Sequence, residues 1–204
     1  MYVTVKRILD LLLSTVALLV LSPLLVGLTL AVKLGSAGPV LFTQRRIGRD
    51  KRTFDIYKFR TMRIDTPHDV PTHLLPDPES YITRTGRFLR KTSLDELPQL
   101  WNILRGDMSF VGPRPALWNQ FDLIAARDVH PGRYGFTPNS VRPGLTGLAQ
   151  ISGRDELSIP DKVALDNAYV DRFGFAMDCR CFFGTFSSVL HHRGVAEGAK
   201  KEHL

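Results

Sequence analysis

The chain has 204 residues, of which 44% are hydrophobic and 23% are charged, a composition typical of one folded domain with a sizeable core. Its formal net charge of +7 suits anionic partners such as nucleic acid, phosphorylated small molecules or an anionic membrane surface, although such charge also serves solubility. Two cysteines at C-x-C spacing, Cys179 and Cys181, exclude a disulfide framework, and histidines without metal-site spacing argue against a transition-metal site.

The beginning of the chain is strongly hydrophobic. The run from Leu11 to Val32 contains no charged residue and is long enough to cross a bilayer core, which takes about 20 apolar residues. A secretory signal peptide is the alternative, with Ser36-Ala37-Gly38 as a weak cleavage site, but its apolar core would be shorter. We therefore expect residues 1–36 to form a membrane element.

Ser22-Pro23 interrupts this hydrophobic run near its middle. Proline removes a backbone donor and clashes with the preceding turn, so the helix is expected to kink or break there, and Ser22 can bond a freed backbone group. Lys6 and Lys33 place positive charge at both ends, so the positive-inside rule does not orient the segment. The residues alone leave a kinked spanning helix and a re-entrant hairpin equally open.

A basic β-hairpin is predicted next. Residues 39–45 and 53–61 read as two strands, and residues 47–51, rich in Gly and Asp, read as the turn between them. Such a hairpin faces either phosphate groups and lipid headgroups or simply solvent. Its basic residues are Arg45, Arg46, Arg49, Lys51, Arg52, Lys58 and Arg60.

The rest of the chain is predicted to be mainly helical. Residues 65–80 carry four prolines and are predicted to form a loop. Residues 81–92 are predicted to form a short basic helix or turn, and 93–105 and 116–127 to form helices. Residues 130–153 are rich in Gly and Pro and read largely as loop, and 161–192 read as one or two helices. No repeat or second core is evident, so residues 37–204 are expected to form one catalytic domain, with a polar tail from Arg193.

The segment from Ser93 to Arg105 has the sequence features of an amphipathic helix. Ser93 and Glu96 form an S-x-x-E capping box at its start. Helical spacing groups the polar Asp95, Gln99 and Asn102 on one face. The apolar stripe comprises Leu94, Leu97, Trp101 and Leu104.

Two interpretations of the acidic pair Asp95-Glu96 are open from this segment alone. First-turn acids stabilise a helix dipole, and Glu96 would complete the cap. Alternatively, the Asp95 carboxylate attacks phosphorus and forms an acyl phosphate, with Mg²⁺ bridging it to diphosphate oxygens. Basic residues just upstream would then stabilise the phosphoryl charge: Arg84, Arg87, Arg90 and Lys91.

At this point the chain resembles a known family, the bacterial sugar transferases, also called monotopic phosphoglycosyl transferases. The resemblance covers nearly the whole chain, with the motifs in order and at similar spacing. The matching stretches are KR-x-x-D at Lys6–Asp10, the Ser22-Pro23 break, FTQRRIG at Phe42–Gly48, YKFRTM at Tyr57–Met62, SLDELPQLWN at Ser93–Asn102, GDMSFVGPRP at Gly106–Pro115 and RPGLTGLAQISGR at Arg142–Arg154.

The resemblance implies an activity and a fold. Members of the family transfer a sugar phosphate from a UDP-sugar to polyprenyl (undecaprenyl) phosphate and release UMP, as the first membrane step of glycan assembly. They lie at the cytoplasmic face of the bacterial inner membrane, through a re-entrant helix broken at Ser-Pro. We therefore expect an α+β fold, mostly helical with a small β-hairpin, attached to a re-entrant helix over residues 1–36.

The resemblance also implies roles for individual residues. Asp95 and Glu96 correspond to the catalytic dyad, with Mg²⁺ against Asp95. The PRP motif is associated with the uridine end, and further arginines lie near the phosphates. The residues expected at the phosphates or nucleotide are Lys58, Arg60, Arg90, Pro113, Arg114, Pro115 and Arg142.

Two alternatives remain to be distinguished by experiment. A transferase that moves only the sugar would release UDP and would need no covalent carboxyl phosphate. A basic protein anchored to the membrane, binding anionic lipid or nucleic acid without catalysis, explains the charge but not an acidic pair after a basic run. We expect no nucleic acid partner, since aromatic stacking platforms are missing from the sequence. The oligomeric state and the identity of the UDP-sugar stay open.

Overall fold

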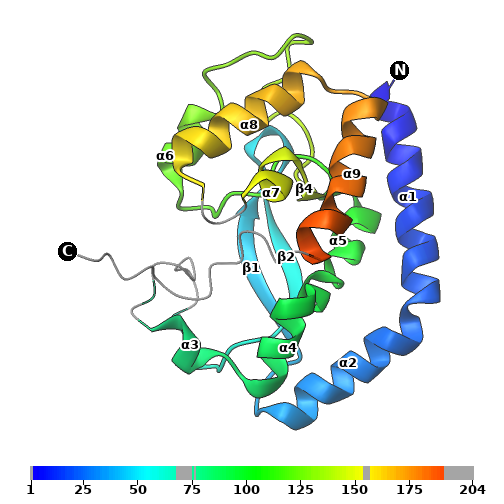
Figure 1. Ribbon diagram of the computed structural model, residues 1–204, viewed down its shortest axis with the longest axis vertical. Helices are drawn as coiled ribbons and strands as arrows, with labels where there is room; N and C mark the ends of the chain where they lie inside the picture. The colour runs from blue at the N-terminus through cyan, green and yellow to red at the C-terminus, as the bar shows by residue number, and fades with distance from the viewer. Residues whose placement is uncertain (1, 68–74, 76, 154–156, 191–204) are drawn as a thin grey trace.

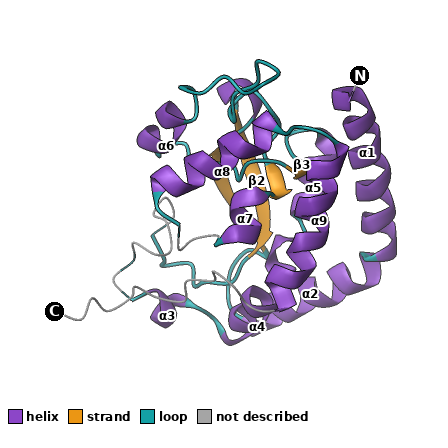
Figure 2. Ribbon diagram, turned by 45° about the horizontal axis from the view of Figure 1, so that its top comes forward, coloured by secondary structure: helices purple, strands orange, loops and turns teal. Residues whose placement is uncertain are grey.

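The computed structural model describes residues 2–67, 75, 77–153 and 157–190, and it has the expected α+β fold. Helices dominate, and they surround two small sheets (Figures 1 and 2). The first sheet is the predicted hairpin. The second, a parallel pair of short strands, was not predicted from the sequence.

The hydrophobic N-terminal segment forms two helices, α1 (Tyr2–Val20) and α2 (Ser22–Gly35). The second helix is bent by 64° from the first, so the predicted break at Ser22-Pro23 is confirmed. Pro23 stands in the first turn of α2, where its missing donor costs least, and the Ser22 hydroxyl donates to the Leu19 carbonyl at 2.8 Å.

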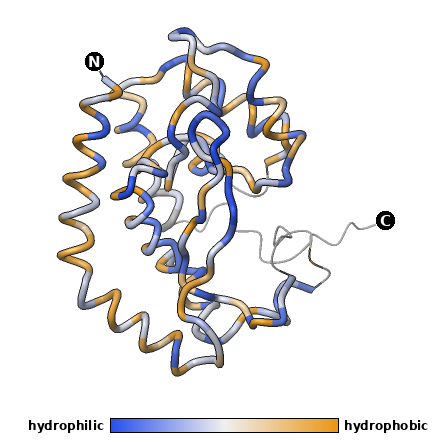
Figure 3. Tube along the Cα trace, turned by 180° about the vertical axis from the view of Figure 1, so that it is seen from behind, coloured by the Kyte–Doolittle hydropathy of each residue, from blue (hydrophilic) through white to orange (hydrophobic). Residues whose placement is uncertain are grey.

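This bent pair is the described part of the chain best suited to a membrane. In the described ranges, no single helix has both the length and the apolar character needed to cross a bilayer, but α1 and α2 together meet that test. Hydrophobic residues run along both helices (Figure 3), and Leu19 and Val20 beside the bend are each 70% exposed. Such a surface is unusual for a protein in water and fits contact with lipid.

The KR-x-x-D motif attaches α1 to the body of the protein. Arg7 donates to the carbonyls of Ile103 and Leu104, at 2.6 and 2.9 Å, at the end of α5 (Gln99–Arg105). Asp10 is buried and accepts bonds from the Ser109 hydroxyl and the Phe110 amide, both at 3.1 Å. The motif therefore sets the position of the apolar helix relative to the rest of the chain.

The hairpin pairs β1 (Leu41–Ile47) with β2 (Thr53–Phe59) in antiparallel register, with Leu41 opposite Phe59. The turn η1 (Arg49–Lys51) contains two residues with positive φ, Asp50 and Lys51. The prediction of strand, turn and strand is thus confirmed, because alternating side chains and a Gly-Asp turn are local signals.

The second sheet pairs β3 (Ser109–Val111) with β4 (Gly144–Thr146) in parallel. Gly112 lies so close to this pairing that an added Cβ would be 2.4 Å from the Arg142 carbonyl. The prediction of residues 130–153 as largely loop was therefore incomplete, and α7 (Leu148–Ser152) follows β4 directly. Three-residue strands are too short to show alternation, and their pairing depends on distant chain.

Helices complete the fold on either side of the sheets. The predicted helical region 161–192 forms α8 (Ile159–Asp171) and α9 (Phe175–Leu190), and Tyr169 and Val170 from α8 pack with Val111 in the main core. The prediction over 116–127 was too long, since α6 spans only Phe121–Ala126. A short helix, α3 (Pro78–Tyr81), lies in the predicted loop 65–80, of which 68–74 and 76 lie outside the described residues.

The expected helix over residues 93–105 is divided. The preceding helix α4 (Arg84–Thr92) ends at Ser93, whose φ of 56° is left-handed. A 3₁₀ turn, η3 (Leu94–Glu96), follows, and α5 begins only at Gln99. The capping box was wrong, because the Ser93 side chain makes no capping bond and, as described below, Glu96 pairs elsewhere. Trp101 is 52% exposed, so the predicted apolar stripe was also wrong there.

Candidate active site

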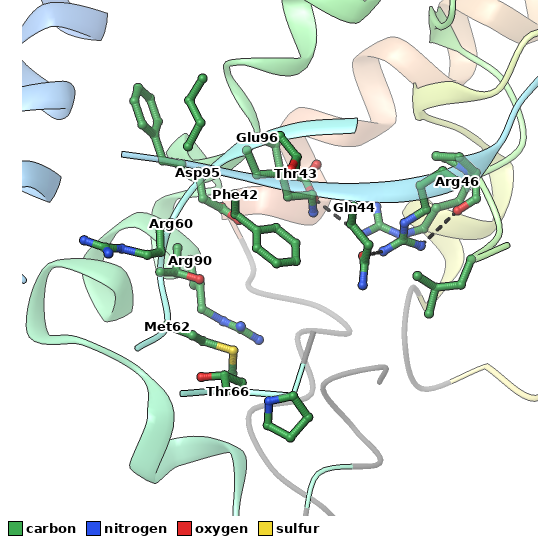
Figure 4. Close-up of a pocket in the computed structure, with 18 of the residues that line it drawn as sticks. Phe42, Thr43, Gln44, Arg46, Arg60, Met62, Thr66, Arg90, Asp95 and Glu96 are labelled. Carbon is green, nitrogen blue, oxygen red and sulfur yellow. Dashed lines mark hydrogen bonds and ion pairs between the residues drawn. The ribbon is translucent and has the colours of Figure 1, made fainter. Parts of the chain in front are cut away.

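The described residues enclose a main cavity of about 670 Å³. Its walls come from the hairpin, η3, the loop after β3, and helices α6 to α8, and Figure 4 shows part of this lining. Its polar and charged lining residues include Gln44, Arg46, Lys58, Arg60, Arg90, Asp95, Glu96, Arg114, Gln120, Arg127, Gln150 and Lys162.

The acidic pair lies at this cavity because of the divided helix. The left-handed residue Ser93 ends α4 and turns the chain, so that η3 presents both Asp95 and Glu96 to the cavity (Figure 4). Of the described residues in the lining, these two are the acidic ones.

Glu96 is held by two cations. Its carboxylate accepts from the Lys58 ammonium at 2.8 Å and from the Arg114 guanidinium at 3.4 Å, with only 12% of the side chain exposed. Lys58 comes from β2 and Arg114 from the PRP loop, so three distant parts of the sequence meet at this carboxylate. Paired in this way, Glu96 fixes the two cations beside its neighbour.

Asp95 differs from Glu96 in its bonding, and its own pKa is perturbed. Within the described part of the chain, no hydrogen bond or ion pair reaches its carboxylate. The pKa of Asp95 is raised to about 6, mainly by burial and also by the charge of Glu96, although the charges of Lys58, Arg90 and Arg114 act to lower it. An ionisable group with a perturbed pKa, open to a cavity and surrounded by cations, is a candidate for chemistry.

Of the remaining predicted phosphate-binding residues, some line the cavity and others bond to neighbouring backbone groups. Arg90, at the end of α4, and Pro115 line the cavity. Arg60 lines it too, but its guanidinium donates to the carbonyl and hydroxyl of Ser36 at 2.8 and 2.9 Å and extends away from the acidic pair (Figure 4). Arg60 therefore joins the end of α2 to the hairpin.

Pro113 and Arg142 lie outside the lining of the main cavity. The Pro113 carbonyl accepts from the Gly144 amide at 2.9 Å, which makes it part of the second sheet. Arg142 lines a separate cavity of about 140 Å³ beside Arg7 and donates from Nε to the Gly106 carbonyl at 2.9 Å. The structure thus does not bring Arg142 together with Asp95.

Several lining residues were not assigned to the site from the sequence, although Arg46 was named among the basic residues of the hairpin. Arg46 donates to the Pro115 carbonyl at 3.1 Å and to the Gln44 side chain at 2.6 Å, which connects β1 to the PRP loop. Gln150 belongs to the motif after Arg142, and Lys162 belongs to α8. Only the motif membership of Arg46 and Gln150 could have indicated them, because residues 114–162 reach the cavity through long-range packing.

The donor set at the cavity suits a magnesium ion held jointly with substrate. The described residues include no group of three or more His, Cys, Asp or Glu side chains that could bind a metal alone. Mg²⁺ usually binds proteins through one or two carboxylates and completes its shell with water and substrate phosphates. Asp95, with carboxylate oxygens open to the cavity, fits that mode.

A partly buried carboxylate among cations, next to a bent pair of apolar helices, defines a class of protein: an enzyme acting on phosphorylated substrates beside a membrane. The model for the bacterial sugar transferase family matches residues 1–192, so this chain belongs to that family. The family is one of undecaprenyl-phosphate sugar phosphotransferases.

Similar proteins extend this result. The chain is 40% identical to the uncharacterized sugar transferase EpsL of Bacillus subtilis (strain 168), over 94% of this chain and 90% of EpsL. It is 38% identical to the exopolysaccharide production protein ExoY of Rhizobium meliloti (strain 1021), over 93% and 87% of the two chains. It is 36% identical to the UDP-glucose:undecaprenyl-phosphate glucose-1-phosphate transferase of Xanthomonas campestris pv. campestris, over 93% of this chain and 39% of that one.

Proposed function

We propose that this protein transfers a sugar 1-phosphate from a UDP-sugar to undecaprenyl phosphate, releasing UMP, through a covalent intermediate on Asp95. The observation that carries the proposal is the Asp95 carboxylate, which is open to the cavity and lies among Lys58, Arg90 and Arg114. The name of the Xanthomonas relative, which contains both UDP-glucose and undecaprenyl phosphate, supports the choice of donor and acceptor.

The reaction proceeds in two displacements. An oxygen of the ionised Asp95 attacks the phosphorus that carries the sugar, the bond to the bridging oxygen breaks, and UMP leaves with that oxygen. The enzyme then holds the sugar phosphate as an acyl phosphate. A phosphate oxygen of the lipid attacks the same phosphorus, which releases Asp95 as a carboxylate and yields a polyprenyl-diphospho-sugar.

The cations around Asp95 stabilise the charge that develops on the transferring phosphoryl group. Lys58 and Arg114 are fixed by Glu96, so their positions need not be reorganised during the reaction. Arg90 adds a third positive charge from the end of α4. Asp95 is the residue that would hold Mg²⁺, and the bound ion would supply positive charge that offsets the charge of the substrate phosphates.

The lipid acceptor enters from the side of α2. Gly38 and Pro39, which follow α2 directly, line the cavity, and Arg60 ties that segment to the hairpin. With α1 and α2 re-entrant, both termini and the catalytic domain lie on the cytoplasmic face of the bacterial inner membrane. Cysteines placed near Met1 and Leu204 should both be protected from an impermeant reagent in intact cells, and labelling of one end alone would contradict re-entry.

The enzymatic test is incubation of the protein with Mg²⁺, undecaprenyl phosphate and a panel of UDP-sugars, with release of UMP as the readout. Mass spectrometry of enzyme quenched with its preferred donor should detect a phospho-sugar adduct on Asp95. Release of UDP instead would indicate a transferase that moves only the sugar. Failure to turn over any UDP-sugar, combined with binding to anionic vesicles, would favour a non-catalytic membrane protein.

A further inference from the structure

Gln150, the middle residue of α7, has an unusual environment. Its side chain is 4% exposed and lines the main cavity. Neither its carboxamide oxygen nor its carboxamide nitrogen has a hydrogen-bond partner within the described residues. Most buried polar side chains are hydrogen-bonded, and leaving one unpaired is destabilising, so a side chain with both groups unpaired requires an explanation.

The backbone around Gln150 is shaped to accommodate this carboxamide. A Cβ added to Gly147 would lie 2.9 Å from the Gln150 Oε1 atom and 2.1 Å from the Gly112 carbonyl oxygen. Only glycine at position 147 therefore allows the loop after β3, the start of α7 and this carboxamide to lie together. The unpaired amide is placed by the packing of the site.

The position of Gln150 in the cavity indicates which part of a donor it meets. One end of the cavity, at Gly38 and Pro39, adjoins α2, where the lipid acceptor enters. Gln150 lies on α7, which packs against α8, and both α6 and α8, which supply further lining residues, lie far from α2 in Figure 1. The end remote from the membrane element is left for the water-soluble part of the donor, its nucleoside.

We propose that Gln150 binds the uracil base of the donor nucleotide and is the contact that selects it. The base presents an N–H donor flanked by carbonyl acceptors, and a carboxamide offers one acceptor and two donors, so the two groups form a paired set of bonds. A phosphate would instead be bound by the cations of the cavity. This inference rests on the proposed function, since that function supplies the uridine nucleotide.

The test compares Gln150→Leu with the unaltered full-length protein in detergent, using UMP as the probe. Leucine has nearly the same size but neither hydrogen-bonding group. UMP binding, measured by titration calorimetry, should weaken about tenfold or more, and the KM for the UDP-sugar should rise similarly. Ribose 5-phosphate, which lacks the base, should compete with the donor equally well in both proteins.

Thermal unfolding separates this role from a structural one. Gln150→Leu removes two unpaired polar groups, so the unliganded variant should unfold at the same temperature as the parent or higher. Gln99→Leu is the matched control, because Gln99 is 2% exposed and has an unpaired Nε2 but does not line the cavity. That variant should bind UMP as the parent does.

Three results would overturn the inference. The first is unchanged UMP binding in Gln150→Leu with a raised KM for the UDP-sugar, which would place Gln150 at the transferred sugar. The second is a lower unfolding temperature with equal loss of UMP and ribose 5-phosphate, which would make its role structural. The third is a parent protein that binds no UMP, which would overturn the proposed function as well, whereas the first two leave that function intact.

Discussion

Two clusters of acidic and basic side chains in the described chain have similar compositions, but the carboxylates of one cluster are hydrogen-bonded and one carboxylate of the other is not. The first joins α1 to the body and contains Asp10 and Asp178, while the second lies at the cavity and contains Asp95 and Glu96. Both bring together residues far apart in the sequence. They differ in how completely the protein satisfies their carboxylates.

In the cluster that joins α1 to the body, both Asp10 and Asp178 accept hydrogen bonds. Asp10 accepts from Ser109 and Phe110, and Asp178 accepts from the side chains of Tyr2, Lys6 and Tyr169. Buried charges that are fully bonded hold elements in place and have little left to offer a substrate.

In the cavity cluster one acid is bonded and the other is not. Glu96 forms ion pairs with Lys58 and Arg114. The same two cations act on Asp95 only by longer-range electrostatic attraction, without a direct bond. The comparison teaches that similar sets of acids and bases differ in whether the fold leaves a carboxylate without bonds and so available to a substrate. The following predictions test that difference, from the largest expected effect to the smallest.

Asp95→Asn should remove turnover, by about 10⁴-fold or more, because a carboxamide cannot form the acyl phosphate. The measurement is the rate of UMP release with saturating UDP-sugar and undecaprenyl phosphate. The variant should keep the fold, since the change is nearly isosteric and the carboxylate has no bonded partner in the described chain. Turnover within tenfold of the parent would eliminate Asp95 as the nucleophile.

Asp10→Ala should lower the free energy of unfolding by about 1–3 kcal/mol, because the buried Ser109 hydroxyl and the Phe110 amide lose their acceptor. Thermal unfolding in detergent measures the change. The rate of UMP release per folded molecule should stay within a few-fold of the parent. A loss of turnover as deep as that of Asp95→Asn, in a protein that remains folded, would contradict the structural role assigned to Asp10.

Asp95→Asn should have the opposite effect on stability at neutral pH, raising the free energy of unfolding by on the order of 2 kcal/mol. The pKa of Asp95 is about 6 in the folded protein against an ordinary 3.8, so folding penalises its ionised form. The parent should therefore lose stability as pH rises from about 4 to about 6, and Asn avoids this loss. Unfolding temperatures that differ equally at pH 4 and pH 7.5 would refute the explanation.

The pH dependence of turnover should follow the same carboxylate. Because attack needs ionised Asp95, kcat/KM should fall as pH drops below about 6. Lys58→Met should move this acidic limb to higher pH, since the Lys58 charge lowers the Asp95 pKa. The control is Lys51→Met, at the hairpin turn, whose salt bridge is with Asp128. A limb that stays in place in Lys58→Met would show that another group controls it.

Much of the local structure could be predicted from the sequence because its signals are local. Ser22-Pro23 breaks the apolar helix through the chemistry of proline, and the hairpin over residues 39–61 follows from alternation around a Gly-Asp turn. Helices α8 and α9 were likewise recognisable from hydrophobic residues alone. The motif set also placed Asp95, Glu96, Arg90 and Arg114, which the structure brings to one cavity.

The shape of the site was not predictable in the same way. The capping box at Ser93 is a valid local pattern, but Glu96 pairs with Lys58 and Arg114 instead, and the helix is divided at the left-handed Ser93. Arg60 and Arg142 look like phosphate ligands in the sequence, yet backbone carbonyls of Ser36 and Gly106 take their donors. The β3–β4 pair was missed because short parallel strands depend on partners distant in sequence.

The sequence by itself determined where the chain is apolar, where it bends and which residues are able to carry the chemistry, because proline geometry, side-chain periodicity and motif spacing act over a few residues. Only the tertiary structure decided which charged groups are satisfied and which are left open. That outcome depends on burial and on partners from distant elements, and it separates Asp95, the proposed nucleophile, from Asp10, whose carboxylate is hydrogen-bonded. It also leaves the carboxamide of Gln150, among the described residues, without a hydrogen-bond partner at the cavity.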